Sequence, residues 1–309
     1  MITSLRLSAF ALGATAVCTS PSKSSTQLFI DFDGTIVTSD AYDALATAAY
    51  ATLPSNSSVL SWDEINSIYS QRADAAAAAL PQPSSLASAI AYADDTSRRD
   101  VEVWSFDWVK DMGLFETAKA DELVKYARNQ ILRSGWCAFA HRAQRNGVHI
   151  NVVSLNWSPS WIRLVLQEAS SCPEVVSRID TFCPEILPRG VLPVSALNHN
   201  ISLFSGGDKT ALITSLLDKV PRANKQKVVF ISDSDADLQP LWETPTNVGV
   251  VAGYDDSAAE AFEKYGVDVW KAREGWKGFT GEETNAVYGF EDWVEVWDLL
   301  WPSRIGKIL

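Results

Sequence analysis

The chain has 309 residues, of which 47% are hydrophobic, and a formal net charge of -12. A chain of this length can bury a large core and is long enough for roughly two domains. Its acidic balance and the lack of a Lys/Arg-rich run exclude a general nucleic-acid binder, which needs a basic surface against phosphates. No apolar stretch reaches the length of a membrane span. We therefore expect a soluble protein with neither nucleic acid nor membrane as a partner.

Residues 1–25 contain no acidic residue, a short apolar run and then a serine-rich stretch. This composition is typical of a weak secretory signal, an organellar transit peptide or a disordered tail, and the residues leave these alternatives open. We expect the first strand of the fold directly after this segment.

The four cysteines, Cys18, Cys137, Cys172 and Cys183, are far apart in the sequence and include no CxxC pair. We predict neither a disulfide framework nor a structural zinc site, and we interpret the cysteines as buried free thiols. This interpretation favours a reducing compartment. The cytoplasm is the first expectation, and the mitochondrion is the alternative if residues 1–25 are a transit peptide.

An apolar strand over Leu28 to Ile30 runs directly into Asp31 and Asp33, with Gly34 behind them. An unpaired carboxylate in an apolar setting destabilises the fold by several kcal/mol or remains protonated. The charge of the two aspartates must therefore be compensated by other groups.

The section that follows the first strand, residues 39–132, is alanine-rich and places apolar residues at three- and four-residue spacing, which predicts helices throughout. From Arg133 the pattern changes to helices that alternate with apolar strands, among them 149–154, 227–232 and 247–251. Strands of this kind indicate a parallel sheet covered on both faces. Residues 191–204 are predicted to form a small antiparallel excursion.

The predicted fold is α/β: a doubly wound, mostly parallel sheet whose first strand is separated from the others by a helical insertion. Ligands of such sheets bind outside the carboxyl ends of the strands, which is where Asp31 and Asp33 lie. Trp293, Trp297 and Trp301 follow a four-residue step and predict the buried stripe of a C-terminal helix.

Further polar residues stand at the ends of predicted strands or the starts of helices: Ser154, Lys209, Asp233, Asp235 and Asp237. Carboxylates gathered near one point repel each other by about 4 kcal/mol per pair at a separation of about 4 Å and an effective dielectric constant of about 20. A divalent cation and a lysine would relieve this repulsion. Mg²⁺ suits the arrangement, because it prefers oxygen ligands and is often held by one or two carboxylates and a substrate phosphate.

Four segments occur in the order DFDGT, VVS, GDKT and SDSDAD, and this ordered set resembles the haloacid dehalogenase (HAD) superfamily of phosphotransferases. The stretch LRSGWCAFAHRAQRNGVHINVVSLNWS further resembles the phosphoserine phosphatase-like branch, with Ser134 in place of the usual proline. The resemblance covers residues 27–37 and 133–251, and the helical insertion matches the cap of that family in position and helical character. It implies a Rossmann-like HAD core over residues 26–38 and 133–309 and an α-helical cap over residues 39–132.

The resemblance also implies roles for single residues. Asp31 would be the nucleophile that forms an aspartyl-phosphate, and Asp33 would act as general acid and base. Mg²⁺ would be held by Asp31, the backbone carbonyl of Asp33 and Asp233, with Asp237 either near the metal or orienting Lys209. The substrate phosphate would be bound by Thr35, Ser154, Asn156 and Lys209.

Several residues near these motifs are left with alternatives. Ser232 occupies the place where the fourth motif commonly has glycine. Asp235 is either one of the metal-site acids or a solvated residue at a helix N-terminus.

Trp157 and Asn156 are each equally packing residues or residues that contact the site. Thr35 equally contacts phosphate or stabilises the turn. Arg98 and Arg99 either reach the substrate or, as we favour, lie on a solvated face paired with nearby acids.

Together these features predict a Mg²⁺-dependent phosphatase that hydrolyses a small phosphorylated metabolite through an aspartyl-phosphate. A catalytically silent binding protein of the same fold is one alternative, although a pure binder has no chemical reason to keep both Asp31 and Asp33. A phosphotransferase or mutase with an acceptor other than water is another, because the cap and water access choose the acceptor. The residues leave the physiological substrate and the oligomeric state open.

Overall fold

The computed structural model describes residues 26–219, 227–243, 245–275 and 286–301. Residues 1–25, including Cys18, lie outside the described residues, so the alternatives for this segment stay predictions. No helix of the described part of the chain combines the length and the apolar character that crossing a membrane would need.

The centre of the fold is an eight-stranded sheet in which every pair of neighbouring strands is parallel. The strand order is β4-β3-β2-β1-β5-β6-β8-β7. The chain therefore builds outward from β1 on one side and then crosses to β5 on its other side, which places a topological switch point at β1. The strands are β1 (Thr26–Ile30), β2 (Ile150–Val153), β3 (Ile179–Cys183), β4 (Asn198–Asn200), β5 (Lys227–Ser232), β6 (Val248–Ala252), β7 (Val269–Lys271) and β8 (Ala286–Phe290).

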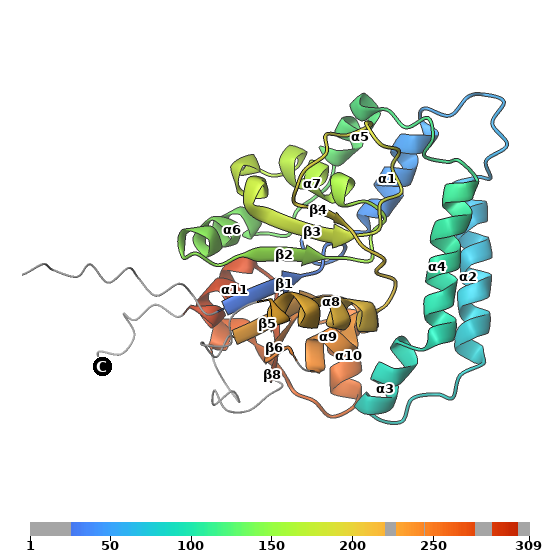
Figure 1. Cartoon of the computed structure of the whole chain (residues 1–309). Helices are drawn as coiled ribbons and strands as arrows, with labels where there is room; N and C mark the ends of the chain where they lie inside the picture. Colours follow the sequence, from blue (N-terminus) through green and yellow to red (C-terminus); the bar gives the residue numbers. More distant parts are fainter. Residues whose placement is uncertain (1–25, 220–226, 244, 276–285, 302–309) are drawn as a thin grey trace, which may run out of the picture.

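Helices cover both faces of this sheet, so the predicted doubly wound α/β class is confirmed (Figure 1). One face packs against α6, α7 and α11, and the other against α8, α9 and α10. The helices are α1 (Ala41–Tyr50), α2 (Trp62–Ala78), α3 (Leu86–Ala93), α4 (Thr96–Asp111), α5 (Ala120–Ala127), α6 (Trp136–Arg145), α7 (Pro159–Glu168), α8 (Gly206–Asp218), α9 (Leu238–Trp242), α10 (Ser257–Lys264) and α11 (Trp293–Leu300).

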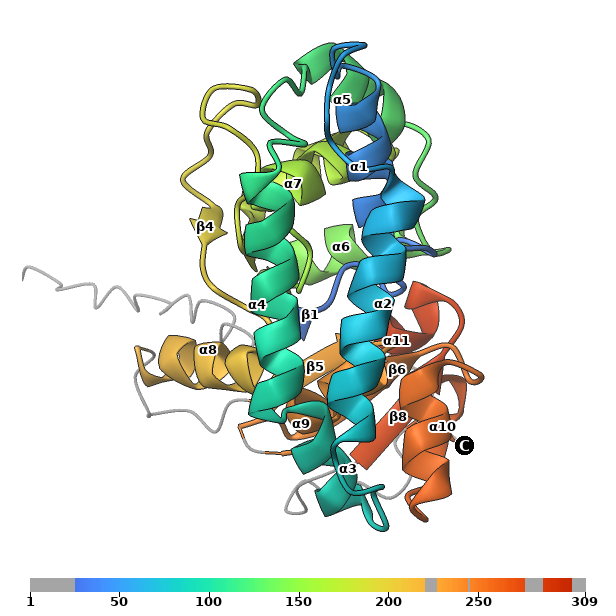
Figure 2. The same ribbon diagram turned by 90° about the vertical axis from the view of Figure 1, so that its right-hand side faces the viewer.

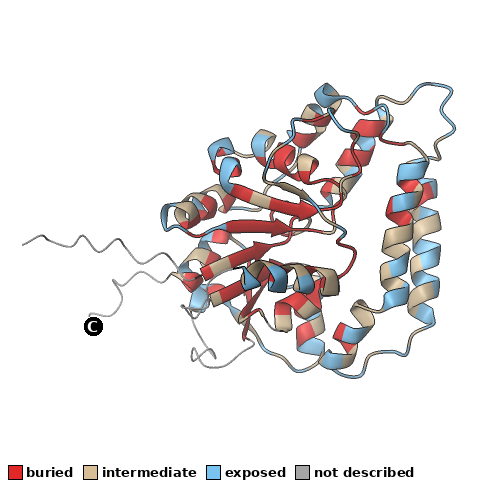
Figure 3. Cartoon of the chain, in the orientation of Figure 1, coloured by how far each residue is buried: buried red, intermediate tan, exposed pale blue. Residues whose placement is uncertain are grey.

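The core forms because successive side chains of each strand point to opposite faces of the sheet, and both faces are covered. Leu28 and Ile30 of β1 join the cluster on the α6/α7 face, whereas Phe29 between them joins the cluster on the α8/α9 face. Figure 3 shows the strands buried along most of their length. Each large apolar side chain buried in this way stabilises the fold by about 1.5–3 kcal/mol.

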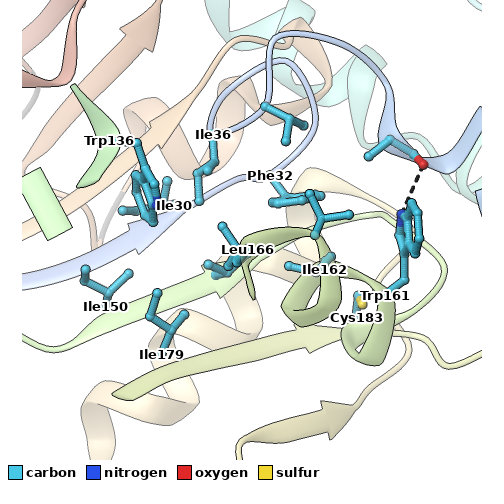
Figure 4. Packing of buried hydrophobic residues seen from close by; sticks show 14 of the residues in the cluster. Ile30, Phe32, Ile36, Trp136, Ile150, Trp161, Ile162, Leu166, Ile179 and Cys183 are labelled. Atoms are coloured by element: carbon cyan, nitrogen blue, oxygen red, sulfur yellow. Dashed lines mark hydrogen bonds between the residues drawn. The ribbon is translucent and has the colours of Figure 1, made fainter. Parts of the chain in front are cut away.

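Packing on the α6/α7 face brings together isoleucines of three neighbouring strands with residues of the two helices (Figure 4). Trp161 of α7 is fully buried, and its indole Nε1 donates a hydrogen bond of 3.0 Å to the carbonyl oxygen of Ala41, at the start of α1. This bond ties the first helix after β1 to the core close to the ends of the strands.

The helical insertion contains two parts that differ in what they contact. Helices α1 and α5 pack against each other, and α5 also packs against α7 of the core. Helices α2 and α4 pack side by side and stand across the carboxyl ends of the strands (Figures 1 and 2). Helix α2 begins at a capping box in which Ser61 and Glu64 bond to each other's backbone N–H groups.

Two sequence predictions are wrong in this part of the fold. Within residues 191–204, β4 runs parallel to β3, with Thr181 paired to Asn198, and no antiparallel pair forms among these described residues. The strand reads only NHN and lies at the edge of the sheet, so no apolar pattern indicated its direction. In α11 the buried stripe consists of Trp293, Val296, Leu299 and Leu300, while Trp297 and Trp301 are only partly buried and stack on each other.

The cysteine prediction is also wrong for one pair. Cys137 of α6 and Cys172 form a disulfide, with their Cα atoms 5.7 Å apart, although 35 residues separate them in the sequence. The spacing of the two cysteines in the sequence did not indicate a disulfide, because α6 and the turn after α7 become neighbours only when the chain folds. Cys183 is a buried free thiol, as predicted.

Candidate active site

The carboxyl ends of the central strands meet at one edge of the sheet and bring the predicted polar residues together. The Asp31 N–H donates to the carbonyl oxygen of Ile231 in β5 (2.8 Å), and the Ser154 N–H donates to that of Phe182 in β3 (3.1 Å), so both residues extend the strand pairing. A cavity of about 250 Å³ opens between these strand ends and helices α1, α2 and α4 of the insertion. Its lining includes Asp31, Asp33, Ser154, Asn156, Lys209, Asp233 and Asp237.

The turn after β1 depends on Gly34, whose φ of 66° lies in the left-handed region. A Cβ atom built there would lie 2.0 Å from Oδ2 of Asp233. The next residue, Thr35, is fully buried, and its hydroxyl donates a 2.9 Å hydrogen bond to Oδ1 of Asp233. Thr35 therefore holds the Asp233 carboxylate. A contact of Thr35 with phosphate stays a prediction.

We expect Gly34→Ala to destabilise the protein by about 1–3 kcal/mol, because alanine would be strained at this φ and would also displace Asp233. The matched control is Gly147→Ala, since Gly147 has a φ of 71° but nothing within 4 Å of an added Cβ atom. Urea unfolding measures the change in stability, and phosphate release from a phosphorylated substrate measures the change in activity. We expect activity to fall only in Gly34→Ala, and equal activity in the two variants would contradict the close-approach account.

Arg133 supports the same turn and is a residue that sequence reasoning did not assign to the site. Its guanidinium donates to the carbonyl oxygens of Gly34 (2.5 Å) and Thr35 (3.2 Å), and its side chain is only 14% exposed. The sequence held two signals for Arg133, namely its place at the border of the insertion and its position directly before Ser134 in the stretch that carries the resemblance. Neither signal indicates what the arginine contacts.

Lys209, in the first turn of α8, is almost fully buried between two carboxylates. Its Nζ lies 3.0 Å from Oδ1 of Asp31 and 2.6 Å from Oδ2 of Asp237. Burial works to lower the pKa of Lys209, but the charges of Asp237 and Asp31 outweigh it and hold the pKa above its usual value. Ser232 donates a 2.7 Å hydrogen bond to the same oxygen of Asp237. The serine in the glycine's place thus fixes the acid that orients Lys209.

The Asp31 carboxyl experiences opposing influences. Burial raises its pKa to about 7, assisted by the negative charges of Asp237 and Asp233, while Lys209 acts in the other direction. A cation bound beside Asp31 would lower this pKa and favour the ionised form. The ionised form is the one that can act as a nucleophile.

Asp33 is held by hydrogen bonds on both of its carboxyl oxygens. Oδ1 accepts from the Ala41 N–H (2.6 Å), and Oδ2 accepts from Nδ2 of Asn156 (2.8 Å). Burial raises the pKa of Asp33 to about 7, so the group exchanges a proton near neutral pH. The side-chain oxygen Oδ1 of Asn156 in turn accepts from the Ser158 N–H (3.2 Å). Asn156 therefore positions Asp33, and its contact with phosphate stays a prediction.

The carboxylates at the cavity are oxygen ligands of the kind that Mg²⁺ prefers. No three His, Cys, Asp or Glu side chains in the described ranges are grouped so that they could hold a metal ion by themselves. Mg²⁺ usually takes only one or two carboxylates and completes its octahedron with water and phosphate. Asp31 and Asp233 supply two carboxylates, and burial raises the pKa of Asp233 to about 6. Oδ1 of Asp237 is also buried, and no residue in the described part of the chain hydrogen-bonds to it. These observations fit a Mg²⁺ site completed by the substrate.

Asp235 does not join the cavity. It lies in the first turn of a short 3₁₀ helix, is exposed, and its N–H donates to the Ser257 hydroxyl (3.0 Å). Of its two predicted roles, the solvated helix N-terminus is the one that the structure supports.

The helical insertion contacts α8 next to Lys209. Arg99 of α4 pairs with Asp208 of α8 at 2.9 Å, and the Asp94 carboxylate after α3 accepts from the Gly207 N–H at 2.9 Å. Arg99, whose side chain is 34% exposed, therefore pairs with an acid as favoured, but this acid lies in α8 and is distant in the sequence. Trp157 lines the cavity, so it faces the site.

Comparisons with known proteins give similarities of structure. No protein-family model matches this chain, and no curated protein matches it. Among solved structures, a phosphoserine phosphatase described as a phospho-aspartyl intermediate analogue is similar with a TM-score of 0.48 and 12% identity, over 89% of this chain and 99% of that one.

Two further solved structures resemble the chain. A phosphoserine phosphohydrolase-like protein from Francisella tularensis subsp. tularensis has a TM-score of 0.46 and 12% identity, over 89% of this chain and 99% of its own. A HAD family hydrolase from Salmonella enterica subsp. enterica serovar Typhi has a TM-score of 0.44 and 13% identity, over 74% of this chain and 62% of its own. These are similarities of fold, and at such identities and TM-scores they do not by themselves establish an activity.

Proposed function

We propose that the protein is a Mg²⁺-dependent phosphatase that hydrolyses a small phosphorylated metabolite through an aspartyl-phosphate on Asp31. The observation that carries this proposal is the pairing of Asp31 with the buried Lys209, 3.0 Å away, beside a second carboxyl group, Asp33, whose pKa is near 7. One carboxylate is thereby poised for attack and the other for proton transfer.

The proposed reaction divides hydrolysis into two displacements. The Asp31 carboxylate attacks phosphorus while the bond from phosphorus to the substrate oxygen breaks, and protonated Asp33 gives its proton to that oxygen. Asp33 then takes a proton from the water that attacks the aspartyl-phosphate, which releases inorganic phosphate and restores both carboxyl groups. Asp33 is fixed for both transfers by Ala41 and Asn156.

Charge on the transferring group would be compensated by side chains that are already in place. Lys209 brings its ammonium group, and Ser154, which is 1% exposed, brings a hydroxyl group. Both interactions strengthen as water leaves the cavity. When bound by Asp31, Asp233 and the Asp33 carbonyl, Mg²⁺ would add positive charge beside the phosphate.

The mechanism is consistent with a division of the chain into a cap and a core, which is itself a proposal. We assign residues 39–132 to the cap and residues 26–38 and 133–309 to the core. Within the cap, α2 and α4 supply most of the residues that line the cavity, α1 adds Tyr42, and α5 packs on α1 and on α7 of the core. Closure of the cap would exclude water during the first displacement.

The compartment in which the protein works is also a proposal. The expectation of free thiols favours the cytoplasm, with the mitochondrion as the alternative. The disulfide between Cys137 and Cys172 counts against a reducing compartment, because disulfides persist mainly in oxidising ones.

Removal of the metal provides the test of the proposed function. Phosphate release from a panel of phosphorylated metabolites and p-nitrophenyl phosphate is expected to stop in EDTA and to return with Mg²⁺. At a concentration of 100 times its Kd, Mg²⁺ should also stabilise the fold by about 2.7 kcal/mol. Release that continues in EDTA would contradict the metal dependence. No release from any substrate would favour the silent binding protein, and phosphate found on an added alcohol would favour a transferase.

A further inference from the structure

The side of the cavity that faces the cap is lined by aromatic residues. Tyr42, Trp62 and Trp157 form a continuous group, here called the aromatic wall, with ring centroids 6.1 to 6.3 Å apart in all three pairs. Tyr69 and Trp108 line the cavity beside it. The three residues of the wall come from α1, from α2 and from the loop after β2, so the wall joins cap and core.

A hydrogen bond to an acidic residue holds one ring of the aromatic wall in place. The Trp62 indole Nε1 donates to Oδ1 of Asp43 (2.8 Å). This bond restrains the indole before any ligand binds, which reduces the entropy lost on binding. Burial raises the pKa of the Tyr42 hydroxyl, and the negative charges of Asp40 and Asp43 raise it further, so the wall lies in a negative potential.

Glu102 of α4 brings a carboxylate to the same side of the cavity. The Tyr69 hydroxyl donates to its Oε1 (2.6 Å), and no hydrogen bond to Oε2 is made within the described part of the chain. Burial raises the pKa of Glu102, while Tyr69 and Arg98 act in the other direction. Arg98 itself stacks on Tyr92 and does not line the cavity. Glu102 has no role in the proposed phosphatase mechanism.

The charged residues that line the cavity away from the reacting centre are all acidic. Among the described residues that line the cavity, Lys209 is the only basic one, and both of its partners are carboxylates. A second anionic group on a substrate, such as a carboxylate, would therefore meet Glu102 and Asp40 with no cation to compensate it. An organic cation would meet a carboxylate and the electron-rich faces of aromatic rings, which is the combination that recognises alkylated ammonium groups.

We propose that the alcohol part of the substrate carries an organic cation of the alkylated ammonium type, seated against the aromatic wall with Glu102 as its counter-charge. The inference rests on the proposed phosphatase function, because it names the substrate class of the same site. The cation takes no part in bond making. Water cleaves the phosphate ester through Asp31, and the products are inorganic phosphate and the free cationic alcohol.

The test compares two substrates that differ in one atom. Choline phosphate carries a trimethylammonium group, and 3,3-dimethylbutyl phosphate has carbon in place of that nitrogen. With the full chain and Mg²⁺, we expect kcat/KM to be at least about tenfold higher for choline phosphate, mainly through KM. Glu102→Gln should reduce this ratio several-fold. Asp107→Asn, an exposed acid on the same helix that does not line the cavity, should leave the ratio unchanged.

A binding measurement separates this inference from the proposed function. Quenching of tryptophan fluorescence by choline is expected to saturate at lower concentration than quenching by 3,3-dimethylbutanol, and to weaken in Glu102→Gln, whether or not the protein turns over phosphate. Equal binding of the two alcohols would overturn the inference. Turnover of p-nitrophenyl phosphate with no preference between the two esters would overturn it as well, while leaving the phosphatase proposal intact. Choline binding without any turnover would support the cation site and reject the phosphatase.

Discussion

Asp31→Asn is expected to lower kcat by about 10⁴-fold or more on every substrate, because the amide cannot form the covalent intermediate. The stability of the folded protein should not decrease. Burial raises the pKa of the wild-type carboxyl group to about 7, so a neutral amide of the same shape removes a charge that the surroundings disfavour. We expect the Tm of the variant to equal or exceed that of the wild type. Phosphate release and thermal unfolding measure the two effects.

Asp235→Asn is the matched control for that variant. Asp235 lies in the same acidic segment as Asp233 and Asp237, but it is exposed and does not line the cavity. The activity of Asp235→Asn should stay within about twofold of the wild type, because substitutions of surface residues outside the core and the active site usually have small effects. If Asp31→Asn keeps a tenth of the activity, or if Asp235→Asn loses as much as Asp31→Asn does, the assignment of the nucleophile is wrong.

Lys209→Met is expected to abolish activity and to destabilise the fold by about 3–5 kcal/mol at pH 8, because it leaves the Asp31 and Asp237 carboxylates buried without their cation. The loss has a defined pH dependence. Without Lys209, burial and the charges of Asp237 and Asp233 hold the pKa of Asp31 above its value in the unfolded state, so the folded state binds more protons and the variant recovers stability as pH falls.

Urea unfolding at pH 8 and pH 5 tests this expectation. Lys219→Met, a substitution of an exposed lysine at the C-terminal end of the same helix, should change stability by no more than about 0.5 kcal/mol at either pH. A Lys209→Met variant as stable as the wild type at pH 8 would mean that the two carboxylates are compensated by something other than this lysine.

The sequence predicted that a set of polar residues would meet at the carboxyl ends of the strands, because of a property of parallel sheets. Asp31, Ser154 and Asp233 each follow a buried strand, and parallel strands put their carboxyl ends at one edge. The order of the four motifs then indicated which loops would meet. The structure places the predicted site residues other than Thr35 around one cavity, while the Thr35 hydroxyl bonds to Asp233. The catalytic, phosphate-binding and metal-binding roles of these residues stay predictions.

The remaining features depend on contacts between segments that are distant in the sequence. The disulfide partners are 35 residues apart, and the direction of β4 follows from its pairing with β3 rather than from its own residues. Glu102 looks like an ordinary exposed helix acid until α2 and α4 pack together and place Tyr69 against it. Burial and partner of a charged helix residue cannot be deduced from a helical period alone.

The central claim, a phosphoryl group carried by Asp31, is tested most directly by acid-quenched mass spectrometry. The full chain is mixed with Mg²⁺ and a substrate that it turns over, quenched within milliseconds, digested and analysed for the peptide that contains Asp31. We predict that this peptide gains the mass of one phosphoryl group, that hydroxylamine removes it, and that Asp31→Asn never gains it. Turnover with no phosphoryl group on this peptide, or with the group on another residue, would contradict the mechanism.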